Sequence, residues 1–319
     1  MSTLKCSISV CMSCLLGLAI ASIPVRPAAA DDDAAARPKI VELAIFPDRL
    51  DLAHQADARR VLVTGRAEDG TSYDLSGEAT LHADGEQIEV GADGFVEPKG
   101  VGETTLTVKA AGLEAKIPVA VGGIDAHPVS FVRDVVPVIS KVGCNAGTCH
   151  GARAGKAGFK LSLRGYDPLY DYRALVDDVS GRRFNRSMPG QSLMLLKPTQ
   201  GVPHEGGFLF DENSRYYRLI QQWIAEGCEF DSTARVSDIE IFPKKPLLQK
   251  AGDRQQILVV ATYPDGSTRD ITREAIFESS NFEVATVGKT GVIEAIRRGE
   301  AAALVRYEGI YATVPVTVI

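Results

Sequence analysis

Two heptapeptides at opposite ends of the chain decide its fold: DGTSYDL at 69–75 and DGSTRDI at 265–271. They lie 196 residues apart, and the tripeptide IFP recurs at the same offset, at 45–47 and 241–243. A later Gly-Glu pair also recurs, one residue further apart. The chain therefore contains two copies of one unit, separated by a different central segment.

Each copy consists of short runs with alternating or continuous apolar residues. Examples of these runs are 61–63, 106–108, 257–260 and 314–318. Asp-Gly pairs, which favour tight turns, separate them at 69–70, 93–94 and 265–266. Short strands spaced by turn residues predict a β-sandwich for each copy.

The repeated unit resembles the bacterial immunoglobulin-like domain of group 2. The IFP tripeptide, the heptapeptide turns and GVIEAIRRGEA at 291–301 carry the resemblance, which covers 39–122 and 235–319. It implies two all-β Ig-like sandwiches that act as spacers or adhesive modules, with surface or cell-wall contacts. We assign no metal to their Asp-Gly turns.

The first thirty residues have the pattern of a secretory signal peptide. Lys5 precedes an apolar run at 10–23, and small residues at 27–30 supply a cleavage site after Ala30. We therefore expect export to the periplasm or the cell surface, with 31–38 as a linker. A membrane anchor is the alternative, but the run is short for a span and the mature chain has no second one.

Composition excludes several classes of protein. The 319 residues are 45% hydrophobic and 24% charged, with a net charge of −6, and basic and acidic residues are interspersed. Nothing forms the basic stripe of a nucleic-acid-binding protein. The motifs G-x-S-x-G and H-E-x-x-H are absent, so we expect no enzyme activity.

Helical periodicity replaces alternation between the two copies. Apolar residues between 216 and 224 recur at helical spacing, with Asn213 or Ser214 as N-cap and Gly227 as the stop. A second amphipathic stretch covers 131–142, where Pro137 predicts a kink or a helix start near Asp134. We expect a small, mainly-α domain at 126–232.

The segment CNAGTCH, from Cys144 to His150, carries the chemistry. Two cysteines followed by histidine is the order needed for covalent haem attachment, since the thiols add to the vinyl groups and the imidazole binds the iron. The usual spacing is two residues, and the extra two would rotate the cysteines apart by about 200° on a helix. Asn145 and Gly147 therefore predict a looped-out segment.

The surroundings resemble a class-I cytochrome c. The stretch 131–151 is similar to its entry, and 192–227 to its ligand loop and final helix. The stretch 143–172 resembles more closely the cytochrome-c-like region of exported planctomycete proteins with flanking Ig-like domains. The resemblance implies one covalent haem c, electron transfer, and redox partner proteins that the sequence does not identify.

The second iron ligand departs from the cytochrome pattern. Where that family has methionine, this chain has Val202-Pro203-His204, and His204 is the nearest residue able to bind iron. We predict His150 as the proximal ligand and His204 as the distal one, with Met188 as the alternative. Met194 lies among leucines and is predicted to be core.

Three alternatives stay open at this point. A disulfide between Cys144 and Cys149, favoured by an oxidising compartment, would leave a surface or adhesive protein without cofactor. A zinc site would use Cys144, Cys149 and His150 with His204 or Cys228. If His204 does not reach the iron, an open sixth position would allow a haem enzyme or sensor. We assign no role to Cys228.

Overall fold

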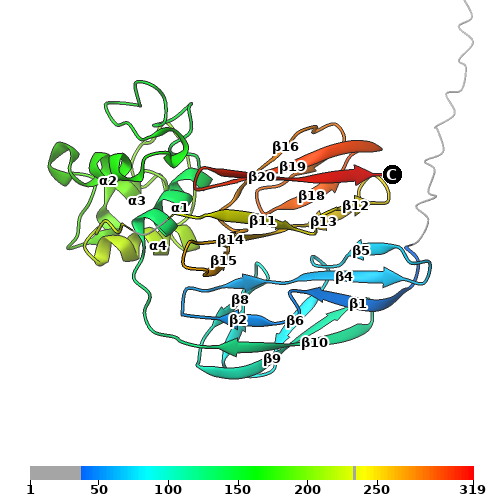
Figure 1. Cartoon of the computed structure of the whole chain (residues 1–319). Coiled ribbons are helices and arrows are strands. Elements are labelled where there is room, and N and C mark those ends of the chain that lie inside the picture. Colours follow the sequence, from blue (N-terminus) through cyan, green and yellow to red (C-terminus); the bar gives the residue numbers. More distant parts are fainter. Residues whose placement is uncertain (1–36, 233–234) are drawn as a thin grey trace, which may run out of the picture. The chain divides into compact units, whose positions relative to one another are not determined.

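The computed structural model describes residues 37–232 and 235–319. The predicted signal peptide at 1–30, and all but the last two residues of the predicted linker at 31–38, lie outside the described residues. Within those residues, no helix has the length and apolar character required to cross a membrane. The chain contains two β-sheet-rich, sandwich-like regions that flank a small helical segment, as Figure 1 shows.

The first β-region contains ten strands. They are β1 Ile40–Phe46, β2 Leu50–Leu52, β3 Arg59–Arg60, β4 Leu62–Ala67, β5 Ser72–Asp74, β6 Thr80–Ala83, β7 Ile88–Val90, β8 Phe95–Pro98, β9 Gly102–Ala110 and β10 Leu113–Val121. They form three sheets with the orders β1-β4-β5, β2-β10-β9-β6 and β3-β8-β7. Inward-facing residues such as Leu50, Leu106 and Val119 form one core between the sheets.

The second β-region contains ten more strands. They are β11 Asp238–Phe242, β12 Leu247–Leu248, β13 Arg254–Gln256, β14 Leu258–Thr262, β15 Thr268–Asp270, β16 Ile276–Ser279, β17 Ala285–Val287, β18 Val292–Ala295, β19 Gly299–Tyr307 and β20 Ile310–Val318. Their sheet orders are β11-β14-β15, β12-β20-β19-β16 and β13-β18-β17. Each order is the first region's order with ten added to every strand number.

This identity of topology confirms the internal repeat predicted from the heptapeptides. Phe46 pairs with Leu62, and Phe242 pairs with Leu258 at the equivalent ladder position. The Asp-Gly pairs lie in the predicted turns, where Gly70 has φ +84° and Gly266 has φ +81°. These left-handed conformations suit glycine because a Cβ would be strained there.

The helical segment contains four short α-helices. They are α1 Val136–Lys141, α2 Pro168–Val176, α3 Leu193–Leu196 and α4 Arg215–Ala225. A π-helical turn, Phe131–Val135, precedes α1, and 3-10 turns occur at Leu163–Gly165, Asp178–Gly181 and Pro189–Gln191. Helix α4 matches its prediction, since the Ser214 side chain accepts a hydrogen bond from the Tyr217 amide and Gly227 follows with φ +106°.

The predicted disturbance near Pro137 is a change of helix type. Backbone geometry passes from a π-helical turn to α1 between Val135 and Val136, and Pro137 occupies the first turn of α1. Proline lacks the amide hydrogen that an interior helical position needs, so the first turn is where it fits.

The core of the helical segment brings its first and last helical elements together. The Phe131 ring lies 5.1 Å from the Trp223 ring, and both side chains are almost fully buried. The Trp223 indole N–H donates to the Glu229 carbonyl at 2.9 Å, which satisfies its buried polar atom. The segment that enters the cysteine loop is therefore fixed against α4.

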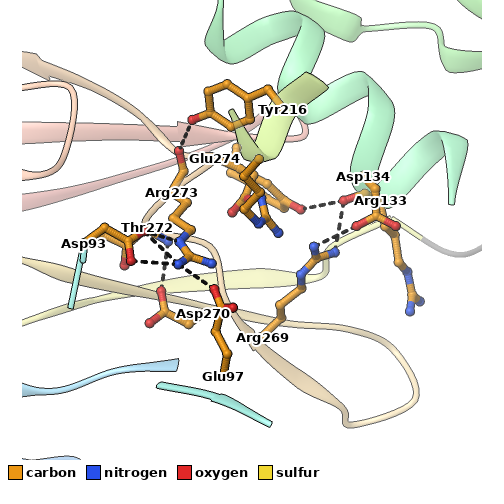
Figure 2. Close-up of polar contacts among 12 residues, drawn as sticks. Asp93, Glu97, Arg133, Asp134, Tyr216, Arg269, Asp270, Thr272, Arg273 and Glu274 are labelled. Carbon is orange, nitrogen blue, oxygen red and sulfur yellow. Dashed lines mark hydrogen bonds and ion pairs between the residues drawn. The ribbon is translucent and has the colours of Figure 1, made fainter. Parts of the chain in front are cut away.

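Charged side chains join the helical segment to the second β-region. Arg269, at β15, lies 2.7 Å from the carboxylate of Asp134 in the π-helical turn. The Tyr216 hydroxyl of α4 donates to the Arg273 carbonyl at 2.9 Å. Figure 2 shows these contacts, together with the Arg273 side chain directed toward Asp93 and Glu97 of the first β-region.

Candidate functional site

The predicted haem-attachment segment forms a closed loop. The His150 amide donates to the Cys144 carbonyl at 2.9 Å, and the Gly151 amide donates to the Ala146 carbonyl at 3.1 Å. Asn145 is buried at the base of the loop, and its amide nitrogen donates to the Ser140 hydroxyl at 2.8 Å. A succession of turns therefore carries the two extra residues between the cysteines.

Gly151 makes this closure sterically feasible. A Cβ at this position would lie 2.0 Å from the Asn145 carbonyl oxygen and 2.9 Å from that of Ala146. Only a residue without a side chain permits such a close approach of two backbone segments. Gly151 immediately follows His150, so the close backbone approach at Gly151 also fixes the position of the His150 backbone.

His150 is held in one tautomer. Its Nδ1 lies 3.1 Å from the Phe159 carbonyl oxygen, and its ring lies 4.6 Å from the Phe159 ring. A carbonyl oxygen only accepts hydrogen bonds, so Nδ1 carries the proton and Nε2 presents its lone pair. Burial lowers the pKa of His150 from its usual value, while the bond to Phe159 opposes that shift. The neutral, metal-binding form is therefore favoured.

His204 has the same hydrogen-bonding arrangement on a separate loop. Its Nδ1 lies 3.2 Å from the Gly207 carbonyl oxygen, which again assigns the proton to Nδ1. The Lys197 ammonium donates to the Pro203 carbonyl at 3.0 Å and ties this loop to the end of α3. Donation of one ring N–H to a backbone carbonyl is the usual way in which a protein orients a metal-binding histidine.

The imidazole rings of His150 and His204 lie close together and nearly parallel. Their ring centroids are 6.4 Å apart and their planes differ by 11°. Since a metal–imidazole bond is about 2 Å long, one ion held by a nitrogen of each ring would place the centroids about 6 Å apart. The centroid spacing of the pair is close to that value.

The cysteines of the loop are unlinked thiols, and so is Cys228. Burial, followed by the proximity of Cys149, raises the pKa of Cys144 to about 12. Burial also raises the pKa of Cys228. Zinc binds the thiolate form of cysteine, which burial disfavours at Cys144.

The zinc alternative needs a cluster of ligands. Among residues 37–232 and 235–319, no group of three or more His, Cys, Asp or Glu side chains is arranged to hold a metal ion. The histidine pair has two members, fewer than the four ligands of a structural zinc site.

The two candidate methionines occupy different environments. Met194 packs against the helical core, in agreement with its prediction. Met188 caps the Pro189–Gln191 turn, and its side chain is 60% exposed.

Large apolar side chains are exposed near the loop. Leu163, half exposed, has its Cδ1 3.6 Å from where a Cβ on Gly147 would lie. Phe208, 60% exposed, follows the glycine that accepts from His204.

Sequence reasoning missed the residues that support this site. Phe159, Gly207 and Lys197 fix the two histidines, two of them through backbone carbonyls that any residue would provide. Gly151 could have been identified from the sequence, because a glycine directly after the histidine indicates a close approach of two backbone segments.

No protein-family model and no curated protein matches the chain. Among solved structures, domains 5–6 of the S-layer protein SbsC align with 13% identity over 89% of this chain and 99% of that one, with a TM-score of 0.34. Domains 4–9 of the same protein align at 12% identity over 89% and 32%, with a TM-score of 0.32. Extracellular domains 3–5 of Drosophila OTK align at 9% identity over 88% and 62%, with a TM-score of 0.18. At these values none of them assigns a family or a function.

Proposed function

We propose that this chain is an exported electron-transfer protein with one covalent haem c in a class-I cytochrome-like domain at 126–232, between Ig-like domains at 39–122 and 235–319. The proximity of the His150 and His204 rings, each with Nδ1 bonded to a backbone carbonyl, carries the proposal. Periplasmic or cell-surface location is proposed from the leader at 1–30.

The residues have distinct roles in this proposal. Cys144 and Cys149 would form the thioether links, and His150 and His204 would be the axial ligands. Bound haem supplies one-electron redox chemistry. With both axial positions filled by histidine, no coordination site is left for substrate, so we propose a carrier and not an enzyme.

The order of elements supports the cytochrome-like reading of the segment. A helical entry leads into the cysteine loop, and a final helix packs on that entry through Phe131 and Trp223. The exposed side chains of Leu163, near Gly147, and of Phe208, next to Gly207, add apolar surface at the cysteine loop and the His204 loop. A porphyrin is largely apolar, so such surface suits its faces and edge.

A second candidate is a surface structural protein without cofactor. The observation that favours it is the aromatic core of the helical segment, in which Phe131, Tyr172 and Trp223 pack against one another. Cys144 and Cys149 are not linked to each other, so the structure does not show the disulfide that we considered for this alternative.

The deciding experiment is expression of the full chain in cells with a working cytochrome c maturation system. The haem proposal expects intact mass to increase by one haem, and the reduced protein to show sharp, split α and β absorption bands. Purified protein with no added mass and no Soret band would refute it and leave the structural candidate.

Variants then assign the ligands. His204→Ala should convert the spectrum to five-coordinate, high-spin iron, while Met188→Ala, the matched control, leaves it unchanged. A five-coordinate spectrum in the wild type would instead indicate an open sixth position, and so a haem enzyme or sensor. An unchanged spectrum in His204→Ala together with a changed one in Met188→Ala would transfer the distal role to Met188.

A further inference from the structure

The two β-regions contact each other through equivalent residues. The Gln256 amide of β13 donates to the Asp74 carboxylate of β5 at 2.6 Å. The Arg60 amide of β3 donates to the Asp270 carboxylate of β15 at 2.8 Å. Gln256 follows Arg60 by 196 residues and Asp270 follows Asp74 by the same number, which is the offset of the heptapeptides. Each β-region therefore supplies one donor and one acceptor to a reciprocal pair of hydrogen bonds.

A third contact joins a residue to its own equivalent. The rings of Phe46 and Phe242, again 196 residues apart, have centroids separated by 4.4 Å. In a pair of units related by a two-fold axis, a residue meets its own equivalent near the axis and every other contact occurs twice. The reciprocal hydrogen bonds and the phenylalanine pair have this pattern. The two β-regions therefore form a pseudo-two-fold pair, with the geometry of an isologous dimer.

Both carboxylates are oriented by the same local turn. The other oxygen of Asp74 accepts from the Ser76 amide at 3.0 Å, and that of Asp270 accepts from the Thr272 amide at 2.9 Å. An aspartate that binds the amide two residues further along the chain forms an Asx-turn. Because this turn holds one carboxylate oxygen and leaves the other for the opposite β-region, the second aspartate of each heptapeptide is an interface residue.

One contact breaks the symmetry. The Arg273 guanidinium lies within 2.9 Å of carboxylate oxygens of Asp93 and Glu97 in the first β-region (Figure 2). The first β-region has Gly77 at the position equivalent to Arg273, and the second has Thr290 at the position equivalent to Asp93. Two first β-regions would lack both ion pairs, and two second β-regions would lack the one to Asp93. Charge complementarity therefore favours the pairing of a first with a second β-region.

The first β-region is connected to the rest of the chain by residues 122–130, which contain no helix or strand. The second β-region is held to the helical segment by the Asp134–Arg269 ion pair and by the hydrogen bond from Tyr216 to the Arg273 carbonyl. The helical segment and the second β-region therefore form one body, and the first β-region docks on it through the pseudo-two-fold interface. The connection at 122–130 has the position of a hinge between them.

We propose that this interface also joins copies of the chain: the first β-region of one copy docks on the second β-region of another copy, and the reverse, in an exchanged dimer. Such a dimer keeps the interface contacts of the single chain, because the change of course is confined to the connection at 122–130. Within one chain the two β-regions have an effective concentration in the millimolar range, so exchange is favoured where copies are crowded or the connection cannot close. The inference goes beyond the proposed function and does not depend on haem.

The test shortens the connection in the full-length protein. Deleting residues 123–126 removes up to about 13 Å of reach, so we expect the first β-region no longer to reach the second β-region of its own chain. Light scattering after size-exclusion chromatography at micromolar concentration should then give a dimer, whereas the wild type stays a monomer. A shortened chain that unfolds cooperatively in urea and is monomeric would overturn the proposal.

Substitutions in the shortened chain identify the surface that forms the dimer. Phe46→Glu places a charge against Phe242 and should raise the dissociation constant of the dimer at least about tenfold. Phe282→Glu is the matched control, because Phe282 is a phenylalanine of the second β-region that is 73% exposed. Its dissociation constant should stay within about twofold of that of the shortened chain. Equal effects of the two substitutions would show that the dimer forms elsewhere.

A cross-linking experiment at natural chain length makes the test independent of the deletion. Phe46→p-benzoylphenylalanine is prepared as isotopically light and heavy chains, which are mixed at millimolar concentration and irradiated. We expect cross-links from position 46 of one copy to the peptide that contains Phe242 of the other, identified by their mixed isotope content. Cross-links between copies that join position 46 to the same position would mean that like β-regions pair. Cross-links confined to single chains would mean that no exchange occurs, and either result would overturn the proposal.

Discussion

The guanidinium of Arg269 lies 2.7 Å from the carboxylate of Asp134, with the two side chains 18% and 10% exposed. Arg269 also donates to the Arg133 carbonyl at 3.2 Å. This contact connects β15 to the helical turn that leads into the cysteine loop, as Figure 2 shows. The second β-region is thus an integral support of the helical segment and not a detached spacer.

Removing the Arg269 guanidinium should lower the stability of the protein. Arg269→Met leaves the Asp134 carboxylate without its counter-ion, so we expect the free energy of unfolding to fall by about 3–5 kcal/mol. Arg297→Met is the control, because the Arg297–Glu283 pair is 60% and 63% exposed and should contribute less than about 1 kcal/mol. Urea unfolding monitored by Trp223 fluorescence measures the free energy of unfolding of both variants. Similar losses in the two variants would contradict a special role for Arg269.

Arg273 should couple the two β-regions. Its side chain is 13% exposed and lies 2.9 Å from Glu97 and 2.7 Å from Asp93. A double-mutant cycle with Arg273→Gln and Glu97→Gln should give a coupling free energy of about 1 kcal/mol, since contacting ion pairs are not additive. A coupling free energy near zero, measured by urea unfolding, would mean that this contact does not hold the regions together.

Lys141 should make stability depend on alkaline pH. Its ammonium donates to the carbonyls of Ala275 and Lys289 and lies over the Phe277 ring. Burial lowers the pKa of Lys141 from 10.5 to about 8. The unfolded chain therefore keeps a proton that the folded protein releases, and the free energy of unfolding rises with pH between these two values.

The variant Lys141→Met lacks this titration. Relative to the variant, the free energy of unfolding of the wild type should rise by on the order of 3 kcal/mol between about pH 8 and about pH 10.5. Below this range the difference between the two proteins should not change with pH. Urea unfolding of both proteins across this range provides the measurement. Parallel pH profiles would show that Lys141 titrates normally in the folded protein.

Gly151 should tolerate no side chain. In Gly151→Ala the new methyl group would lie 2.0 Å from the Asn145 carbonyl oxygen, a contact that forces the loop to open. We expect a loss of about 2–4 kcal/mol in the free energy of unfolding and loss of covalent haem attachment. Gly147→Ala is the control within the same loop, because its methyl group meets only Leu163 at 3.6 Å. Equal behaviour of the two variants would show that the loop closes differently.

Much of the architecture was predictable because its signals are local or repeated. The heptapeptides at 69–75 and 265–271 predicted two like units, and their strands have the same order in every sheet. Ser214 and Gly227 predicted the limits of α4, since caps act on neighbouring backbone groups. The stretch around Pro137 predicted a disturbance, but not the π-helical turn before it.

The candidate site was predictable only in part. The motif from Cys144 to His150 identified three residues, and His204 was identified by its place in the loop where the resemblance expected a ligand. The backbone carbonyls of Phe159 and Gly207, which select the tautomers, left no mark in the sequence because every residue has a carbonyl. The ion pairs of Arg269 and Arg273 could not be predicted either, because the sequence offers each charge many possible partners.

The amino-acid sequence by itself determined the repeat, the turns, the helix caps and the cysteine-histidine order, because these depend on residues close in the chain or on its self-similarity. Tertiary structure alone decided that the ring centroids of His150 and His204 lie 6.4 Å apart and that Asp134 pairs with Arg269. Those pairs join segments far apart in the chain, which only the packing of the folded chain brings together. Local sequence patterns carry no record of that packing.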